Sequence, residues 1–185
     1  MIKKLSQAAI LAAGILAIGG CTLNQARTTP PVAKAAAPDY QAPVPPSPPA
    51  GNIRAYCYNP ADLATVQGRM VQGELSVAYL QCQTTGGGRA YESQYAAFVA
   101  KFNGDLAANY RALAQVARNK RLNVDVFVTE ISNRTAQRAP VDREFCPRSK
   151  RALDWALDPK VTSLAQVPPP FNLGPEMNIF PCPTP

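Results

Sequence analysis

The chain has 185 residues and no histidine. Histidine is the usual general base of serine and cysteine hydrolases and a frequent ligand of zinc and haem iron. Its absence excludes Ser-His-Asp and Cys-His catalysis, His-ligated haem and most zinc sites. The C-x-x-C-H motif that attaches c-type haem is missing as well. We therefore expect no cofactor, no metal site and no catalytic residues.

Apolar runs long enough to span a membrane are also missing. The apolar stretch at the N-terminus covers residues 5–18, whereas a membrane-spanning helix needs about 20 residues. Lys3 and Lys4 precede this stretch, and Gly19 and Gly20 follow it. Basic residues, a short apolar run and small residues in this order are typical of a signal peptide.

The residue after the two glycines is Cys21, and Ile-Gly-Gly-Cys resembles the lipobox of bacterial lipoproteins. The resemblance implies a lipoprotein signal peptide over residues 1–20, cleaved before Cys21, and a lipid on that cysteine. Thr22 at the next position implies export to the outer membrane, with the protein facing the periplasm. The alternative is an ordinary secretory signal in which the cysteine occurs by chance.

Charged residues make up only 17% of the chain, and their balance is mildly basic. Dense clusters of one sign would indicate an anionic partner, but acidic residues interrupt both basic neighbourhoods. We expect these side chains on solvated helix faces, with anionic lipid, cell-wall polymer or an acidic partner as the alternative. No nucleic-acid motif is present, so no nucleic-acid partner is expected. The two neighbourhoods comprise Arg118, Lys120 and Arg121, and Arg143, Arg148, Lys150 and Arg151.

Proline is unevenly distributed, with eight prolines in residues 22–51 and eight in residues 159–185. Proline fixes φ and lacks the backbone donor, so residues 21–51 are predicted to be a disordered, extended tether for the domain at 52–185. Thirty residues of this kind reach at most about 90 Å. A docking ligand for a partner is the alternative. The second proline-rich segment differs because its apolar residues should pack back onto the domain, namely Phe171, Leu173, Met177, Ile179 and Phe180.

Apolar periodicity between these segments predicts four helices. The first begins at Asn59-Pro60, stops before Gly86 and carries a core-facing stripe with a close approach at Gly73. The expected fold is all-α, a four-helix up-and-down bundle with an irregular tail. The third helix contains β-branched residues, so a strand is the alternative for this segment. The stripe consists of Leu63, Val66, Met70, Gly73, Val77 and Leu80, and the other helices cover about 89–119, 123–138 and 142–157.

Four cysteines remain besides Cys21, and an even number in a small exported domain indicates disulfides. Their places relative to the predicted helices favour Cys82–Cys146 as an internal clamp and Cys57–Cys182 as a staple for the tail. Each could stabilise the fold by roughly 4 kcal/mol. A redox or metal site is the alternative, although the spacing is not that of C-x-x-C.

The remaining polar and aromatic residues can have either a structural role or a functional one. The helical carboxylates could include a general acid–base pair but are predicted to be exposed charges. Residues 84–89 could cradle an anion but are predicted to be an interhelical turn. The tyrosines could form a partner surface but are predicted to fill gaps between helix ends. The carboxylates are Glu74, Glu92, Asp105, Asp125, Glu130 and Asp154, and the tyrosines are Tyr56, Tyr58, Tyr91 and Tyr95.

Three segments of the mature domain resemble small exported helical proteins of alphaproteobacteria whose function is not established. They are Val77–Cys82, Tyr95–Val99 and Phe145–Cys146. The resemblance supports the Cys82–Cys146 pairing and brings no catalytic residues.

Together these patterns predict a lipid-anchored envelope interaction or scaffold protein without catalytic activity. Its partners would be the membrane, through the lipid, and an envelope protein or the cell wall. The alternative is a periplasmic binding protein or inhibitor with an apolar groove between helices, for a small ligand or a hydrolase. A third possibility is a glycan-cleaving enzyme that uses carboxylates alone.

Overall fold

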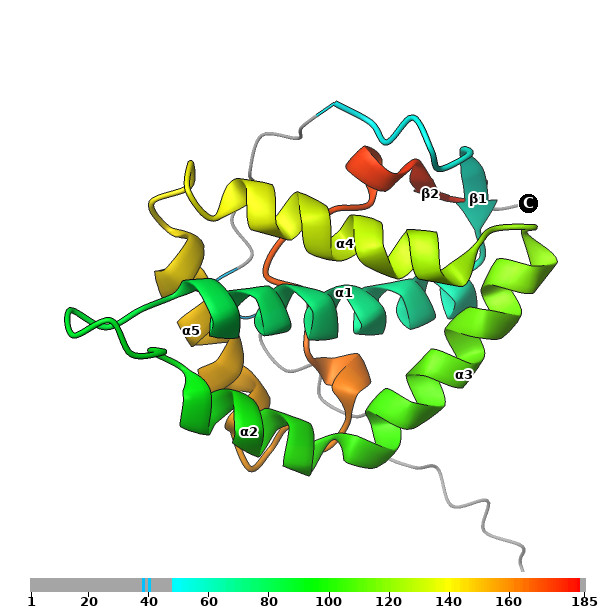
Figure 1. Cartoon of the computed structure of the whole chain (residues 1–185). Helices are drawn as coiled ribbons and strands as arrows, with labels where there is room; N and C mark the ends of the chain where they lie inside the picture. The colour runs from blue at the N-terminus through cyan, green and yellow to red at the C-terminus, as the bar shows by residue number, and fades with distance from the viewer. Residues whose placement is uncertain (1–37, 39, 41–47, 184–185) are drawn as a thin grey trace, which may run out of the picture. The chain divides into compact units, whose positions relative to one another are not determined.

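The computed structural model describes Pro38, Tyr40 and residues 48–183 (Figure 1). The signal peptide, Cys21 and most of the expected tether lie outside the described residues. The described chain is mostly helical, as predicted, with a small parallel sheet and two 3-10 turns. Its elements are β1 (Tyr56–Tyr58), α1 (Pro60–Gln81), α2 (Glu92–Lys101), α3 (Asn103–Asn119), α4 (Val124–Arg138), α5 (Phe145–Leu157), η1 (Leu164–Gln166), η2 (Pro175–Met177) and β2 (Ile179–Pro181).

Helix α1 begins where the sequence predicted. The side chain of Asn59 accepts a hydrogen bond from the backbone N–H of Asp62 at 2.8 Å, and Pro60 occupies the first turn. Both features suit a helix start. After α1 the chain makes the expected interhelical turn, in which Gly87 has a φ of 80°. Glycine adopts this left-handed conformation without a steric cost.

The helix predicted over residues 89–119 is two helices, so the described chain has five helices and not four. Phe102 separates α2 from α3 with a ψ of 18°, and its ring is buried. Gly104, a weak helix former, follows two residues later. Because of the bend, α2 packs mainly on α5 while α3 packs on α1.

The up-and-down arrangement is not confirmed, because α1 is a central helix that contacts the four others. Figure 1 shows α4 alongside α1, and α2 and α3 meeting at an angle beside it. The predicted close approach at Gly73 is confirmed: a Cβ there would lie 2.7 Å from Cγ2 of Ile131 in α4. Leu80, the last residue of the predicted stripe, is half exposed instead of buried. A stripe with seven-residue repeats drifts by about 20° per heptad around a straight helix, so its end leaves the core.

The C-terminal tail packs back onto the helices, as expected. Phe171, Leu173 and Met177 are buried, and β2 pairs in parallel with β1. Phe180 is the exception, with 44% of its surface exposed. Successive strand residues point to opposite faces, so its neighbour Ile179 takes the buried side.

Both predicted disulfides are present. The Cys57–Cys182 bond joins residues of the β1 and tail segments with a Cα–Cα distance of 4.6 Å. The Cys82–Cys146 bond links the end of α1 to α5 across 5.7 Å. One bond therefore holds the tail and the other holds the helices.

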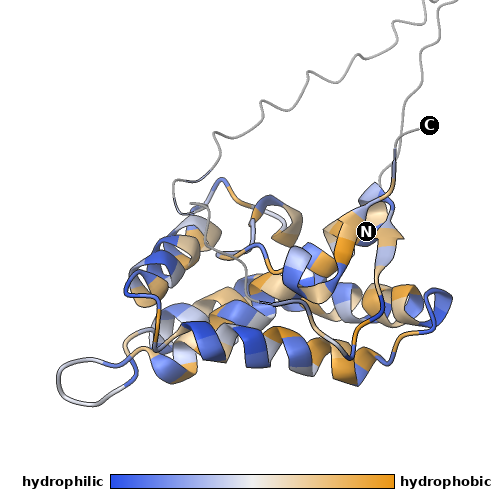
Figure 2. Ribbon diagram, turned by 90° about the horizontal axis from the view of Figure 1, so that it is seen from above, coloured by the Kyte–Doolittle hydropathy of each residue, from blue (hydrophilic) through white to orange (hydrophobic). Residues whose placement is uncertain are grey.

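The core includes residues from the range that was predicted to be tether. Tyr40 and Ala50 are buried. The Tyr40 hydroxyl donates to the carbonyl oxygen of Pro168 at 2.9 Å, and Arg148 donates to the carbonyl of Tyr40 at 2.9 Å. Packing thus begins upstream of Asn52, the expected start of the domain. Each helix in Figure 2 carries both polar and apolar residues, as helices with one buried face do.

Candidate functional site

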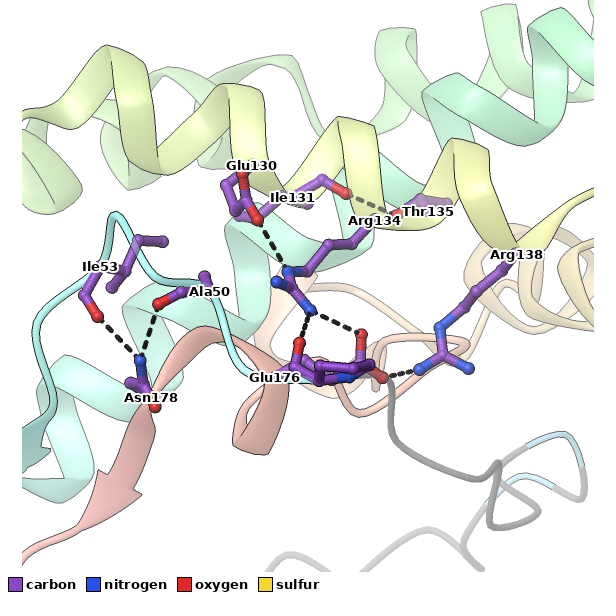
Figure 3. A network of polar contacts seen from close by, with 10 residues as sticks. Ala50, Ile53, Glu130, Ile131, Arg134, Thr135, Arg138, Glu176 and Asn178 are labelled. Atoms are coloured by element: carbon purple, nitrogen blue, oxygen red, sulfur yellow. Dashed lines mark hydrogen bonds and ion pairs between the residues drawn. The ribbon is translucent and has the colours of Figure 1, made fainter.

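A buried ionic cluster joins α4 to the tail (Figure 3). Glu176 of η2 is fully buried and pairs with both Arg134 and Arg138, the first at 3.5 Å. Arg134 also contacts Glu130 of its own helix at 2.8 Å. The three α4 residues are four positions apart and therefore lie on one face. This spacing is visible in the sequence and could have indicated the cluster.

Glu74 of α1 is a second fully buried carboxylate near this cluster, although it was predicted to be an exposed charge. One of its oxygens accepts a hydrogen bond from the backbone N–H of Phe171 at 2.8 Å. Burial raises the pKa of Glu74 well above its usual value, against the opposing influence of that N–H and of Arg138. The prediction failed because α1 is surrounded by other helices, which leaves few of its positions for solvent.

Arg148 was expected on a solvated helix face and is buried instead. Its guanidinium carbon lies 5.2 Å from the ring centroid of Phe171, and that of Arg138 lies 5.6 Å from it. The same ring stacks on Phe145 of α5 at 5.4 Å. These contacts connect α4, α5 and the tail around one aromatic side chain. Removing one partner of a buried charge pair costs about 3–5 kcal/mol, so the cluster fixes the tail in place.

An accessible groove lies on the outer side of α2, which we call the α2 groove. Its volume is about 690 Å³, and its lining is mainly apolar. The rings of Tyr79 and Tyr95 stack at 5.0 Å with an interplanar angle of 13°. The groove is lined by Tyr79 at the end of α1, by Glu92, Tyr95, Ala96, Val99 and Ala100 of α2, and by Asn103 at the start of α3.

Two long-range contacts described here hold α2 against α5 and therefore fix one side of the groove. The hydroxyl of Tyr91 donates to the carbonyl of Cys146 at 2.9 Å, next to the Cys82–Cys146 bond. At the other end of α2, the Lys101 ammonium donates to the carbonyl of Ala156 at 2.8 Å. Since both contacts join α2 to α5, the groove has a fixed wall.

Arg89 lies next to the groove and not in an anion cradle. Its guanidinium carbon is 4.4 Å from the ring centroid of Tyr79, and its side chain donates to the hydroxyl of the same tyrosine. Glu92 provides a carboxylate at the rim. The groove thus combines a stacked aromatic floor with one charge of each sign. Such a surface suits an apolar side chain flanked by polar groups.

The other candidate residues lie apart from the groove or are buried. Tyr58 of β1 is fully buried and Tyr91 is buried as well, in agreement with the prediction that tyrosines fill gaps, whereas Tyr56 is partly buried. No group of three or more cysteine, aspartate or glutamate residues in the described chain could hold a metal ion. Of the other carboxylates, Glu92 and Asp125 are exposed, Asp105 accepts from the Leu164 N–H, Glu130 pairs with Arg134 and Asp154 pairs with Lys150.

Sequence reasoning missed Tyr79 and Val99 as surface residues. Both occupy ordinary helix positions, and only the packing of α2 beside α1 brings Tyr79 onto Tyr95. None of the described helices is both long and apolar enough to cross a membrane. Comparison of the chain with protein-family models, curated proteins and solved structures gave no match.

Proposed function

We propose that this chain is a lipid-anchored envelope protein that binds a protein partner through the α2 groove. Cys21 carries the lipid, and the described domain faces the periplasm from the outer membrane. The observation that supports the proposal is the open groove itself, with a stacked pair of tyrosines and a volume of about 690 Å³. Its walls belong to a domain held by two disulfides and a buried ionic cluster.

The side chains of the groove favour a helix as the bound element. Ala96 and Ala100 are one helical turn apart and exposed. Small residues at this spacing let the backbone of a second helix approach closely, and Val99 between them adds apolar contact. An amphipathic partner helix would place an apolar side chain against Tyr95 and polar groups towards Arg89. This is the helix-in-groove mode of recognition.

Site-specific photo-crosslinking tests the proposed groove. A photoreactive amino acid at Ala96 should give one discrete crosslinked product in intact cells. The same residue at Ala108, which is exposed on α3, serves as the matched control and should give none. The Val99→Glu variant places a charge in the groove and should abolish the product from Ala96. A product that persists in this variant, or that forms equally from Ala108, contradicts the proposal.

Intact-mass spectrometry of the membrane-extracted protein tests the anchor separately. The proposal requires a chain that starts at Cys21 and carries the mass of three acyl groups. An unlipidated chain would remove the anchor from the proposal and leave the groove untouched.

A second candidate is a carrier of a small apolar ligand. The volume of the groove lies within the range of about 300–1,000 Å³ that is typical of small-molecule sites. An environment-sensitive hydrophobic dye distinguishes the two functions. Saturable dye binding that Val99→Glu abolishes, together with no crosslinked protein from Ala96, would favour the ligand carrier.

A further inference from the structure

A second hollow lies at the opposite end of α1, where the chain passes from α3 to α4. It has a volume of about 240 Å³, and its lining includes Arg54 and Arg121 but no acidic residue. Asn52 and Asn123 add polar groups to the lining. A hollow of this size is smaller than most sites for drug-sized ligands and suits a single polar group.

The two arginines have no partner within the described part of the chain. Neither the Arg54 nor the Arg121 guanidinium takes part in a hydrogen bond or an ion pair there, and both residues are exposed. The neighbouring cation Lys120 differs from Arg121 because its ammonium pairs with Asp62 at 3.5 Å. The guanidinium group is a planar fork of donors that matches carboxylate and phosphate oxygens. Two such groups around one hollow provide donors for a single anion.

The backbone at Arg121 adds an independent observation. Its φ is 54°, in the left-handed region, directly after the end of α3. Glycine is the usual residue at this position of a helix end, and other residues are strained there by about 1–3 kcal/mol. The chain thus keeps a cation at a position where glycine would be more stable.

The field of α4 also favours an anion in this hollow. Asn123 caps α4 and accepts hydrogen bonds from the backbone N–H groups of Asp125 and Val126. Since these donors are already satisfied, the helix contributes the positive end of its dipole and not free amides. Asp125 is an exposed acid in the first turn of the same helix and is not part of the lining.

We propose that this hollow binds a phosphate group, held by the side chains of Arg54 and Arg121. Two guanidinium groups and a helix dipole balance the double negative charge of a phosphate monoester better than the single charge of a carboxylate. The phosphate monoester belongs either to a lipid headgroup that ends in a phosphate or to a soluble phosphorylated compound. The proposal does not depend on the lipid anchor or on the α2 groove.

Arginine side-chain NMR of the full chain tests the site. The protein is labelled with ¹⁵N-arginine, purified in dodecyl maltoside micelles and titrated with inorganic phosphate against sodium chloride of equal ionic strength. The expected result is a saturable shift of the Arg54 and Arg121 side-chain resonances. In Arg54→Gln, the apparent affinity measured from the Arg121 side-chain resonance should be weaker by tenfold or more. In Arg121→Gly, the affinity measured from the Arg54 resonance should be weaker to the same extent.

Two controls separate the site from general charge and from misfolding. The double variant Arg111→Gln/Arg143→Gln removes two exposed cations that do not line the hollow and should leave the affinity within twofold. Arg121→Gly should have a Tm no lower than that of the parent, because glycine relieves the strained φ. A shift that does not saturate, or an equal loss of affinity in the control pair, overturns the proposal.

The same titration distinguishes the two sources of phosphate. Micelles doped with phosphatidic acid, whose headgroup is a phosphate monoester, but not micelles doped with the diester phosphatidylglycerol, should shift the same two resonances if a lipid headgroup is the ligand. If only inorganic phosphate shifts them, the ligand is a soluble phosphorylated compound. Both results support the site.

Discussion

Replacing Gly73 by alanine tests the close contact between α1 and α4. The new Cβ would lie 2.7 Å from Cγ2 of Ile131, whereas carbon atoms in contact normally lie about 3.5–4.0 Å apart. Ile131 is fully buried and cannot turn away into solvent. Overpacking of this kind costs about 1–3 kcal/mol. Alanine also gains about 1 kcal/mol of helix propensity over glycine, so we expect a net loss of roughly 0–2 kcal/mol.

The measurement is urea denaturation with the disulfides intact. Gly104→Ala is the matched control, because Gly104 is also helical and a Cβ there would meet no atom within 4 Å. This control should raise the free energy of unfolding by up to about 1 kcal/mol. Combining Gly73→Ala with Ile131→Leu, which lacks the γ2 methyl group, should give a smaller loss than the sum of the two single changes. If Gly73→Ala stabilises the protein as much as Gly104→Ala does, the argument for a tight crossing is refuted.

Three further predictions concern the core and the disulfides. Burial raises the pKa of Glu74 above its value in the unfolded chain. The folded protein should therefore lose stability as the pH rises above about 4.3, by about 1.4 kcal/mol for each unit by which the folded pKa exceeds the unfolded one. Glu74→Gln should not show this loss, and identical pH profiles of Tm for the two proteins would contradict the prediction. Tyr40→Ala should lower the free energy of unfolding by about 3–5 kcal/mol, as for other buried aromatic residues, and an unchanged Tm would show that this residue does not pack. Dithiothreitol should reduce the Cys57–Cys182 bond before the Cys82–Cys146 bond, because Cys57 is exposed and Cys82 is buried. Alkylation followed by mass spectrometry measures the order of reduction, and the opposite order would contradict the prediction.

Local rules of the chain were sufficient for the start of α1, and the places of the cysteines favoured the correct disulfide pairs. Asn59-Pro60 starts α1 because capping and a fixed φ depend only on neighbouring residues. The pairing was predicted because Cys82 lies at the end of the first predicted helix and Cys146 near the start of the fourth, while Cys57 and Cys182 flank the helical region. The signal peptide and the lipid on Cys21 depend on residues 1–21 alone and stay predictions.

Wrong predictions arose where a residue's environment depends on distant segments. Phe102 continues the apolar stripe of one long helix, yet the chain bends there because α2 packs on α5 and α3 on α1. Tyr40 lies among prolines that predict a tether, but its hydroxyl reaches Pro168, 128 residues later. Neither partner can be identified from local composition.

The sequence by itself determined the helical class, most helix ends, the disulfide pairs and the return of the tail, because each depends on local periodicity, capping or a small number of possible pairings. Tertiary structure alone decided the burial of Glu74, the stacking of Tyr79 on Tyr95 and the hollow beside Arg54. A helix position becomes core or surface only when its neighbours are placed. The candidate sites therefore emerged from the packing of segments that are far apart in the chain.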